Sequence, residues 1–103
     1  MDDQLLEKVQ RFKKRFEKDG FVILGIFGSR ARGDDQPESD IDLLFRLEDS
    51  FYLNHPLWGG VGRIEEIRAE LQASFGFAVD LADLEALRPS AREFILSETI
   101  YVA

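Results

Sequence analysis

Hydrophobic and polar positions divide the chain into segments with two different periods. Near the N-terminus apolar side chains recur every three or four positions, at Leu5, Val9, Phe12 and Phe16. This spacing lines one face of an α-helix and predicts a helix over about residues 3–18, ended by Asp19-Gly20. The run Phe21–Phe27 is apolar on both faces, which is typical of a strand inside a sheet that is covered on both sides. Gly25 within it indicates the close approach of another group.

A second strand is predicted over residues 40–47, where apolar and polar side chains alternate. Its apolar face must enter the core and holds Ile41, Leu43, Phe45 and Leu47. Asp40 and Asp42 therefore share the opposite surface, because side chains two residues apart on a strand point the same way. Between the two strands lie a Gly28-Ser29 turn, a short helical turn over residues 30–32 with Ser29 as its N-cap, and a polar loop.

The second half of the chain adds helices and two extended segments. Residues 48–62 show no regular period and are predicted as a long loop. A helix follows over residues 61–75 and a strand over residues 77–81. Two helical segments come after Asp83, the second beginning at Pro89, and residues 100–102 are extended. This order predicts an α/β (α+β) fold, a small mixed β-sheet flanked by helices, in a single domain over residues 1–103.

Composition narrows the class of partner. The net charge of the 103-residue chain is −7, whereas proteins that hold a nucleic-acid backbone usually present a basic face, so no direct nucleic-acid partner is expected. The chain has no cysteine, which excludes disulfides and thiolate metal ligands. Neither a signal peptide nor an apolar stretch long enough for a membrane span is recognisable, so we expect a cytoplasmic protein without membrane contact.

The Gly-Ser turn and the paired aspartates together indicate a site for nucleotidyl transfer. A Gly-Ser turn at a strand's end places backbone N–H groups and a hydroxyl where they can hold phosphate oxygens. Gly28 lets the backbone approach the phosphates, and Ser29 supplies a donor. Asp40 and Asp42 are natural ligands for Mg²⁺, which favours carboxylates plus substrate phosphates. A pair of such ions can steady the attacking and leaving oxygens of a phosphoryl transfer.

The segments GSRARG and SDIDLL resemble the signature of the DNA polymerase β-type nucleotidyltransferases, in particular their minimal branch. In that family Gly-Ser is followed by ten residues and then Asp-x-Asp, as Gly28-Ser29 is here followed by Asp40-Ile41-Asp42. The similarity extends through FAVDLADL and the tail LRPSAREFILSETIYVA. It implies an antitoxin that pairs with a HEPN-type ribonuclease toxin in a hetero-oligomer. It also implies transfer of AMP from ATP to a tyrosine of that toxin.

Asp80 is predicted as the third carboxylate of the site, which would then hold Mg²⁺ through Asp40, Asp42 and Asp80. Asp83 is a rival nearby, but it is an odd number of residues from Asp80 and so cannot share its face if the strand extends that far. In the family that the chain resembles, this acid often acts as a general base or completes the metal site. Asp80 is therefore the favoured candidate.

Several other residues allow two interpretations. Arg30 and Arg32 could contact the triphosphate or pair with nearby acids, and the predicted nucleotide-binding set is Gly28, Ser29 and Arg30. The aromatic side chains of the 48–62 segment, Phe51, Tyr52 and Trp58, could form an exposed contact patch or fold down as a satellite core, the commoner outcome. The only histidine, His55, is predicted to be a loop residue without a special role.

Two other functions fit the same sequence. The domain could neutralise its partner by occlusion, without catalysis. It could also transfer a nucleotide to a small molecule such as an aminoglycoside, because an acidic surface suits a polycationic acceptor. The absence of a second domain to grip that acceptor counts against the small-molecule reading, and it favours an acceptor that belongs to a partner protein.

Overall fold

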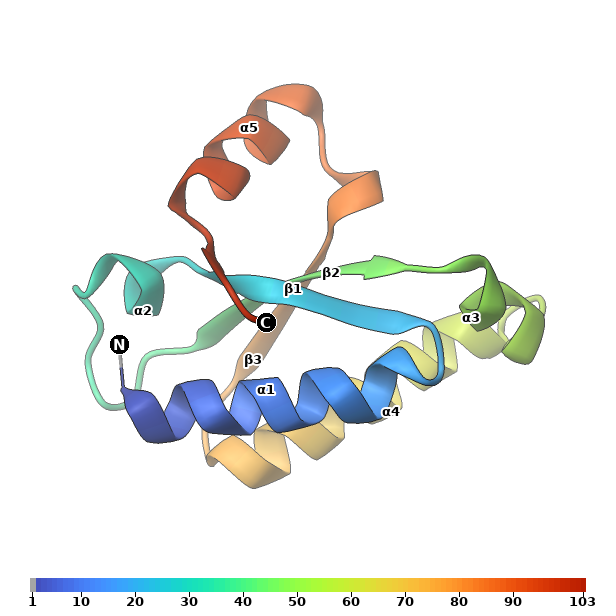
Figure 1. The fold of residues 1–103 in the computed structure, drawn as a ribbon, viewed down its shortest axis with the longest axis horizontal. Coiled ribbons are helices and arrows are strands. Elements are labelled where there is room, and N and C mark those ends of the chain that lie inside the picture. Colours follow the sequence, from blue (N-terminus) through green and yellow to red (C-terminus); the bar gives the residue numbers. More distant parts are fainter. Residues whose placement is uncertain (1) are drawn as a thin grey trace.

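The computed structural model describes residues 2–103 and contains a four-stranded mixed sheet with helices on both faces (Figure 1). The strand order is β3-β2-β1-β4. The central strands β1 and β2 are antiparallel, β4 is antiparallel to β1, and β3 is parallel to β2. Their bounds are β1 Phe21–Phe27, β2 Ile41–Leu47, β3 Val79–Asp83 and β4 Ile100–Tyr101.

Helices α1 (Asp3–Glu17) and α4 (Gly59–Phe75) lie together on one side of the sheet, and α5 (Pro89–Glu98) stands on the other (Figure 1). A 3-10 turn, η1 (Leu84–Ala86), joins β3 to α5. The short helices α2 (Ser29–Arg32) and α3 (Asp49–Asn54) lie at opposite ends of the molecule. The core forms where helices α1 and α4 meet the sheet. Its completely buried side chains include Val9, Ile23, Ile26, Ile41, Leu43, Ile67 and Leu71.

The first half of the chain folds as its hydrophobic pattern predicts. Helix α1 and strand β1 have the expected bounds to within one residue, and β2 starts at Ile41, one residue later than predicted. A Cβ atom on Gly25 would lie 2.4 Å from the carbonyl oxygen of Ile100. The close approach predicted at Gly25 is therefore confirmed, and the approaching group is the chain entering β4.

Three local predictions were wrong. Residues 48–62 are not a loop, because α3 occupies residues 49–54 and α4 begins at Gly59. Strand β3 begins at Val79 rather than residue 77, because its parallel register with β2 starts by pairing Val79 with Ile41. Ser29 is not the N-cap of α2. Gly28 holds that position without a side-chain cap, so the Ser29 hydroxyl is not used for capping.

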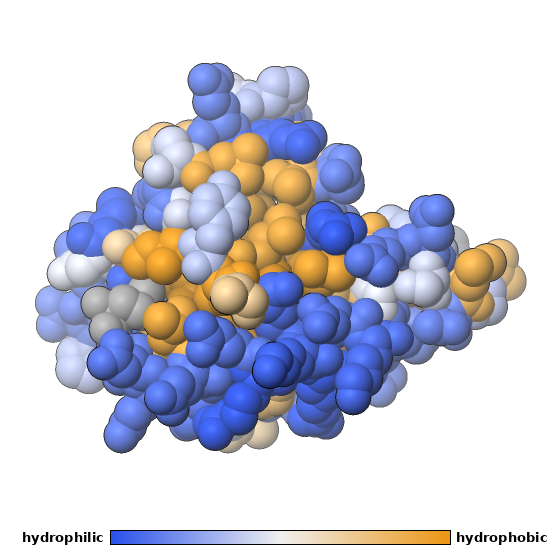
Figure 2. All heavy atoms as spheres, viewed as in Figure 1, coloured by the Kyte–Doolittle hydropathy of each residue, from blue (hydrophilic) through white to orange (hydrophobic). Residues whose placement is uncertain are grey.

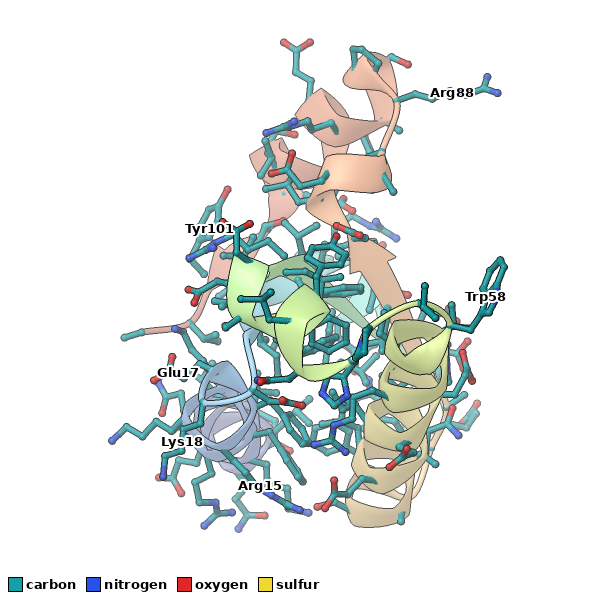
Figure 3. All side chains as sticks on the ribbon, turned by 90° about the vertical axis from the view of Figure 1, so that its right-hand side faces the viewer. Arg15, Glu17, Lys18, Trp58, Arg88 and Tyr101 are labelled. Atoms are coloured by element: carbon teal, nitrogen blue, oxygen red, sulfur yellow. The ribbon has the colours of Figure 1, made fainter. Side chains whose placement is uncertain are left out.

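Exposed hydrophobic side chains gather where α3 meets α4, a region of residues 49–63 that we name the α3–α4 corner. Apolar residues appear at this tip of the molecule in Figure 2, and Figure 3 shows Trp58 extending away from the ribbon. The exposed fraction is 85% for Trp58 and 58% for Tyr52, whereas Phe51 is 1% exposed within the core. Of the two interpretations of these aromatics, burial therefore holds for Phe51 and exposure for the other two.

The α3–α4 corner is tied to the end of α1 through one carboxylate. Asp19 lies 2.8 Å from Nε2 of His55 and accepts a hydrogen bond of 2.9 Å from Nε of Arg63. Burial of the Asp19 carboxyl acts to raise its pKa, but the hydrogen bonds from Arg63 and His55 outweigh it and lower the pKa overall. His55 thus has a structural role, contrary to the prediction. Within residues 2–103, no helix is long and apolar enough to cross a membrane.

Candidate active site

The turn after β1 brings backbone and carboxylate together so closely that only glycine fits. Gly28 has a φ of +78°, in the left-handed region that side chains disfavour. A Cβ atom at this position would lie 1.9 Å from Oδ2 of Asp42. The antiparallel pairing of β1 and β2 causes this approach, because it sets Phe27 opposite Asp42. The Gly-Ser turn and the Asp-x-Asp pair are therefore parts of one site.

Parallel pairing of β2 and β3 adds the third acid. Asp80 is the register partner of Asp42. Asp40 precedes β2 in the loop, and all three aspartates line one cleft of about 550 Å³. The cleft lies between the end of the sheet, helix α2 and helix α5. Its lining also includes Gly28, Ser29, Arg32, Phe94, Ile95 and Glu98. The structure thus brings together the predicted residues Gly28, Ser29, Asp40, Asp42 and Asp80.

Asp83, the rival of Asp80, has a different role. Its carboxylate accepts a hydrogen bond of 3.0 Å from the backbone N–H of Glu85 and so caps the 3-10 turn η1. Asp83 is not among the residues that line the cleft. The two acids sit at opposite ends of β3, separated by the odd number of residues on which the prediction relied. The choice of Asp80 for the site agrees with this placement.

The cleft carries more negative charge than its own groups can balance. The pKa of Asp42 is raised from its ordinary value of 3.8 to about 6. Burial is the largest cause, and Asp80 comes next through repulsion and a hydrogen bond, followed by repulsion from Asp40 and Glu98. Around neutral pH Asp42 is therefore held as an anion against an unfavourable field. A bound cation would relieve this repulsion.

These acids fit a divalent cation that binds together with its substrate. Within residues 2–103, no three carboxylate or histidine groups are gathered closely enough to form a complete metal site. Mg²⁺ does not require one, since it is usually held by one or two protein carboxylates plus substrate phosphates and water. Asp40 and Asp42 are oxygen donors of the required type, and the pKa of Asp42, raised first by burial and then by the neighbouring acids, marks a carboxylate whose ionised form such an ion would stabilise.

The structure does not bring Arg30 to the cleft. Its side chain is only 9% exposed and stacks on the ring of Phe77, 4.0 Å from the centroid. The guanidinium donates to the carbonyl oxygens of Ser39 and Pro37 and pairs with Asp35 at 3.2 Å. Arg30 thus organises the loop before Asp40. Of the two arginines it is Arg32 that lines the cleft.

Helix α5 supplies a wall of the cleft that the local sequence pattern did not reveal. Its last residue, Glu98, accepts a hydrogen bond of 3.1 Å from the N–H of Gly28 and one of 3.0 Å from Nη1 of Arg32. Phe94, which is 62% exposed, lines the same cleft. No spacing in the sequence links Glu98 to Gly28, because they are 70 residues apart. Only the resemblance of the tail to the family could have pointed to this segment.

Comparison with known proteins gives this geometry its context. The protein adenylyltransferase MntA of Thermococcus cleftensis is 30% identical over 90 residues, which cover 87% of this chain and 83% of that protein. A solved structure provisionally described as a minimal nucleotidyltransferase is 30% identical with a TM-score of 0.70, covering 97% of this chain and 95% of its own. A toxin–antitoxin crystal structure with AMP-PNP shares the fold at 19% identity and a TM-score of 0.66, covering 91% and 70% respectively.

The fold and the acidic cleft define an enzyme that transfers nucleotidyl groups. The model of the family described as "Nucleotidyltransferase domain" matches residues 4–102, and the chain belongs to that family. The predicted fold, a mixed sheet flanked by helices as in a minimal nucleotidyltransferase, is confirmed, and so is the predicted enzyme class.

Proposed function

We propose that this nucleotidyltransferase transfers AMP from ATP to a tyrosine hydroxyl of a cognate HEPN-type ribonuclease toxin and thereby acts as its antitoxin. The observation that carries the proposal is the convergence of Asp40, Asp42 and Asp80 on one cleft beside Gly28-Ser29. A relative of similar length is named a protein adenylyltransferase, which supports a protein as the acceptor. A structure of the same fold was obtained as a toxin–antitoxin with AMP-PNP, which supports ATP as the donor.

The residues of the cleft have two roles in this proposal: some bind the metal and others bind the triphosphate. Asp40 and Asp42 would hold Mg²⁺, two ions when the site is full, and Asp80, the register partner of Asp42, would complete the site together with substrate phosphates and water. The bound ion supplies positive charge against the phosphates. Gly28, Ser29 and Arg32 face the triphosphate, because a backbone N–H, a hydroxyl and a guanidinium are all donors to phosphate oxygens. Arg32 replaces the predicted Arg30 here, since the loop before Asp40 engages the Arg30 guanidinium.

The transfer exchanges one phosphorus–oxygen bond for another. The acceptor hydroxyl oxygen forms a bond to the α-phosphorus of ATP, and the bond from that phosphorus to the bridging oxygen of the β-phosphate breaks. Pyrophosphate leaves. The hydroxyl proton passes to a carboxylate, for which Asp80 is the candidate because it is exposed at the cleft whereas Asp42 is partly buried.

The wall formed by α5 suits the nucleoside part of the substrate. Phe94 presents an exposed aromatic ring to the cleft, beside Ile95. An aromatic face can stack with a nucleobase, whichever base it is. We therefore propose that the nucleobase stacks on Phe94 and that the site has little preference among bases.

The experiment that tests the function uses ATP labelled at the α-phosphate. The protein is incubated with Mg²⁺ and a HEPN-type protein encoded beside it, and the products are separated by mass. Label should appear on the partner as one or more AMP units on tyrosine, and the ribonuclease activity of the partner should fall in parallel. Label retained in ATP, with the ribonuclease still inhibited, would instead support occlusion without catalysis.

Two controls separate the remaining alternatives. Asp42→Asn removes a proposed metal ligand and should abolish labelling, whereas Asp83→Asn alters an acid outside the cleft and should preserve it. An aminoglycoside offered in place of the protein should remain unlabelled. Labelling of that small molecule alone would contradict a protein acceptor.

A further inference from the structure

Glu98 occupies two hydrogen-bond donors that could otherwise bind a phosphate. Its carboxylate accepts one hydrogen bond from the N–H of Gly28, at 3.1 Å, and a second from Arg32, at 3.0 Å. The two bonds use different oxygens of the carboxylate, Oε1 and Oε2. The Glu98 side chain is only 13% exposed, and it reaches these partners from the last turn of α5. The contact therefore joins the two walls of the cleft.

This position is electrostatically unfavourable for a fourth acid. Asp40, Asp42 and Asp80 line the same cleft, and Glu98 adds to the repulsion that Asp42 experiences. The two donors offset that repulsion, since hydrogen bonds with a charged partner are roughly twice as strong as neutral ones. Without Glu98 the Gly28 N–H would lose this acceptor, and Arg32 would keep only its pair with Asp34, at 3.3 Å.

A carboxylate and a phosphate use the same recognition chemistry. Both are anions whose oxygens accept from backbone N–H groups, and both match the forked donors of arginine. The Gly28 amide that Glu98 occupies belongs to the turn that the proposed function assigns to the triphosphate. One amide hydrogen cannot serve both acceptors at full strength. Binding of the triphosphate must therefore displace Glu98 or share its donors.

We propose that the Glu98 carboxylate is a built-in stand-in for a substrate phosphate, which occupies the Gly28 amide and Arg32 in the nucleotide-free protein and weakens the binding of triphosphate by competing with it. The proposal rests on the proposed function, because it assigns the triphosphate to this turn. Displacement of Glu98 acts on the end of α5, the helix that also carries Phe94. Phosphate binding is thereby coupled to the wall that faces the base.

The test compares two glutamates on one helix. Glu98→Ala frees both donors, whereas Glu93→Ala makes the same change of charge at an exposed position of α5 outside the cleft. Binding of AMP-PNP and of adenosine is measured by calorimetry in constant excess Mg²⁺. We expect Glu98→Ala to bind AMP-PNP about tenfold more tightly than Glu93→Ala, the effect of roughly one charge-assisted hydrogen bond. The Kd for adenosine, which has no phosphate, should be equal in the two variants.

A second variant separates position from charge. Glu98→Asp keeps the negative charge but withdraws the carboxylate by one methylene, so it should also bind AMP-PNP more tightly than the wild type. Amide NMR gives a readout independent of the variants. Inorganic tripolyphosphate with Mg²⁺ should shift the Gly28 resonance of the wild-type protein as its acceptor changes.

The possible outcomes distinguish the two proposals. If the wild type binds AMP-PNP and both Glu98 variants bind it no more tightly than Glu93→Ala does, the role of Glu98 is overturned and the proposed function is left intact. Binding that is absent in the wild type but appears in the Glu98 variants would support competition in its strongest form. If no variant binds AMP-PNP while all remain folded by circular dichroism, both proposals fail.

Discussion

At the α3–α4 corner the carboxylate of Asp19 is surrounded by donors from His55 and Arg63, whereas at the cleft the carboxylate of Asp42 faces three other acids. The pKa of Asp19 is lowered and that of Asp42 is raised to about 6. Paired charge at the corner stabilises the fold. The unpaired negative charge at the cleft lowers the stability of the fold, and a bound cation would neutralise it. The contrast favours the cleft as the end that serves chemistry.

Exposed hydrophobic side chains show a second contrast, because they gather at the α3–α4 corner rather than at the cleft. The α3–α4 corner leaves Leu57 and Trp58 in water, while its own Phe51 anchors it to the core. Among the residues that line the cleft, Phe94 is the one large hydrophobic side chain that is strongly exposed. Substitutions that neutralise or truncate matching residues at the two ends should therefore act on different properties of the protein.

The largest effect is expected from Asp42→Asn on nucleotidyl transfer. The variant should lose activity by a factor on the order of 10³, because it removes a carboxylate proposed to hold the metal ion that would stabilise the transferring group. Steady-state transfer from labelled ATP measures the effect. Asp19→Asn, assayed at a temperature where it is folded, should retain the wild-type rate. Similar losses in both variants would remove the distinction between the two ends.

The next effect concerns stability at the corner. Phe51→Ala should lower the free energy of unfolding by about 3–5 kcal/mol, because the ring is buried against the core. Trp58→Ser should change it by less than about 0.5 kcal/mol, since that side chain is exposed. Urea unfolding followed by circular dichroism measures both. A large loss of stability in the Trp58 variant would contradict its exposure.

Two glycines with positive φ values allow a comparison at the cleft. Gly28 and Gly33 have φ values of +78° and +83°, but ψ is −156° at Gly28 and 14° at Gly33, so alanine is strained at both positions and more strongly at Gly28. Only at Gly28 would the new Cβ meet Asp42, and nothing lies within 4 Å at Gly33. With both variants assayed at a temperature where they are folded, Gly28→Ala should therefore lose about 10²-fold more transfer activity than Gly33→Ala, because the proposed metal-binding carboxylate of Asp42 is displaced. Equal activities would show that Asp42 can move aside without consequence.

A smaller effect is expected from the Asp19 network on stability. Asp19→Asn should destabilise the fold by about 2 kcal/mol at pH 7, because it weakens hydrogen bonds to a charged acceptor. The folded-state pKa of Asp19 is lowered, so its contribution is present above the unfolded value and is lost as pH falls through the folded value. The gap between variant and wild type in thermal unfolding should thus narrow as the pH falls below the ordinary value of 3.8. A gap that persisted there would point to packing rather than charge.

The smallest expected effect is a gain in stability rather than a loss, and it concerns Asp42 in the cleft. Because the folded-state pKa of Asp42 is raised above its unfolded value, ionisation destabilises the metal-free protein above about pH 6. That penalty fades as pH falls from about 6 toward 3.8. In EDTA, Asp42→Asn should therefore raise the melting temperature at pH 8 but not at pH 4. A melting temperature that is unchanged or lower at pH 8 would contradict the repulsion described here.

Much of the fold was predictable because its helices and strands carry clear periods. The alternation of Ile41, Leu43 and Phe45 specified the buried face of β2, and so the surface that carries Asp40 and Asp42. The same reasoning failed for the segment that contains α3, because Pro56 and the three glycines at residues 59, 60 and 62 interrupt any apolar stripe. There tertiary contacts decide the structure, through Phe51 in the core and His55 on Asp19.

The candidate site was predictable where its residues are close in sequence. Gly28, Ser29, Asp40 and Asp42 lie on consecutive elements, and simple alternation placed Asp80 on the correct side of its strand. One error and one omission came from contacts that no local pattern encodes. Arg30 turns to the loop before Asp40, and Glu98 depends on α5 folding back over the cleft. Both are decided by the packing of distant segments.

The parallel pairing of β2 with β3 has a consequence for protein synthesis. A parallel neighbour requires a long crossover, here the chain from residue 48 to residue 78, before Asp80 can stand beside Asp42. A nascent fragment that ends soon after β2 carries the Gly-Ser turn and two aspartates, yet it lacks the third acid and the α5 wall. Incomplete translation products therefore lack a complete cleft, and nearly the whole chain must be synthesised before the candidate site can form.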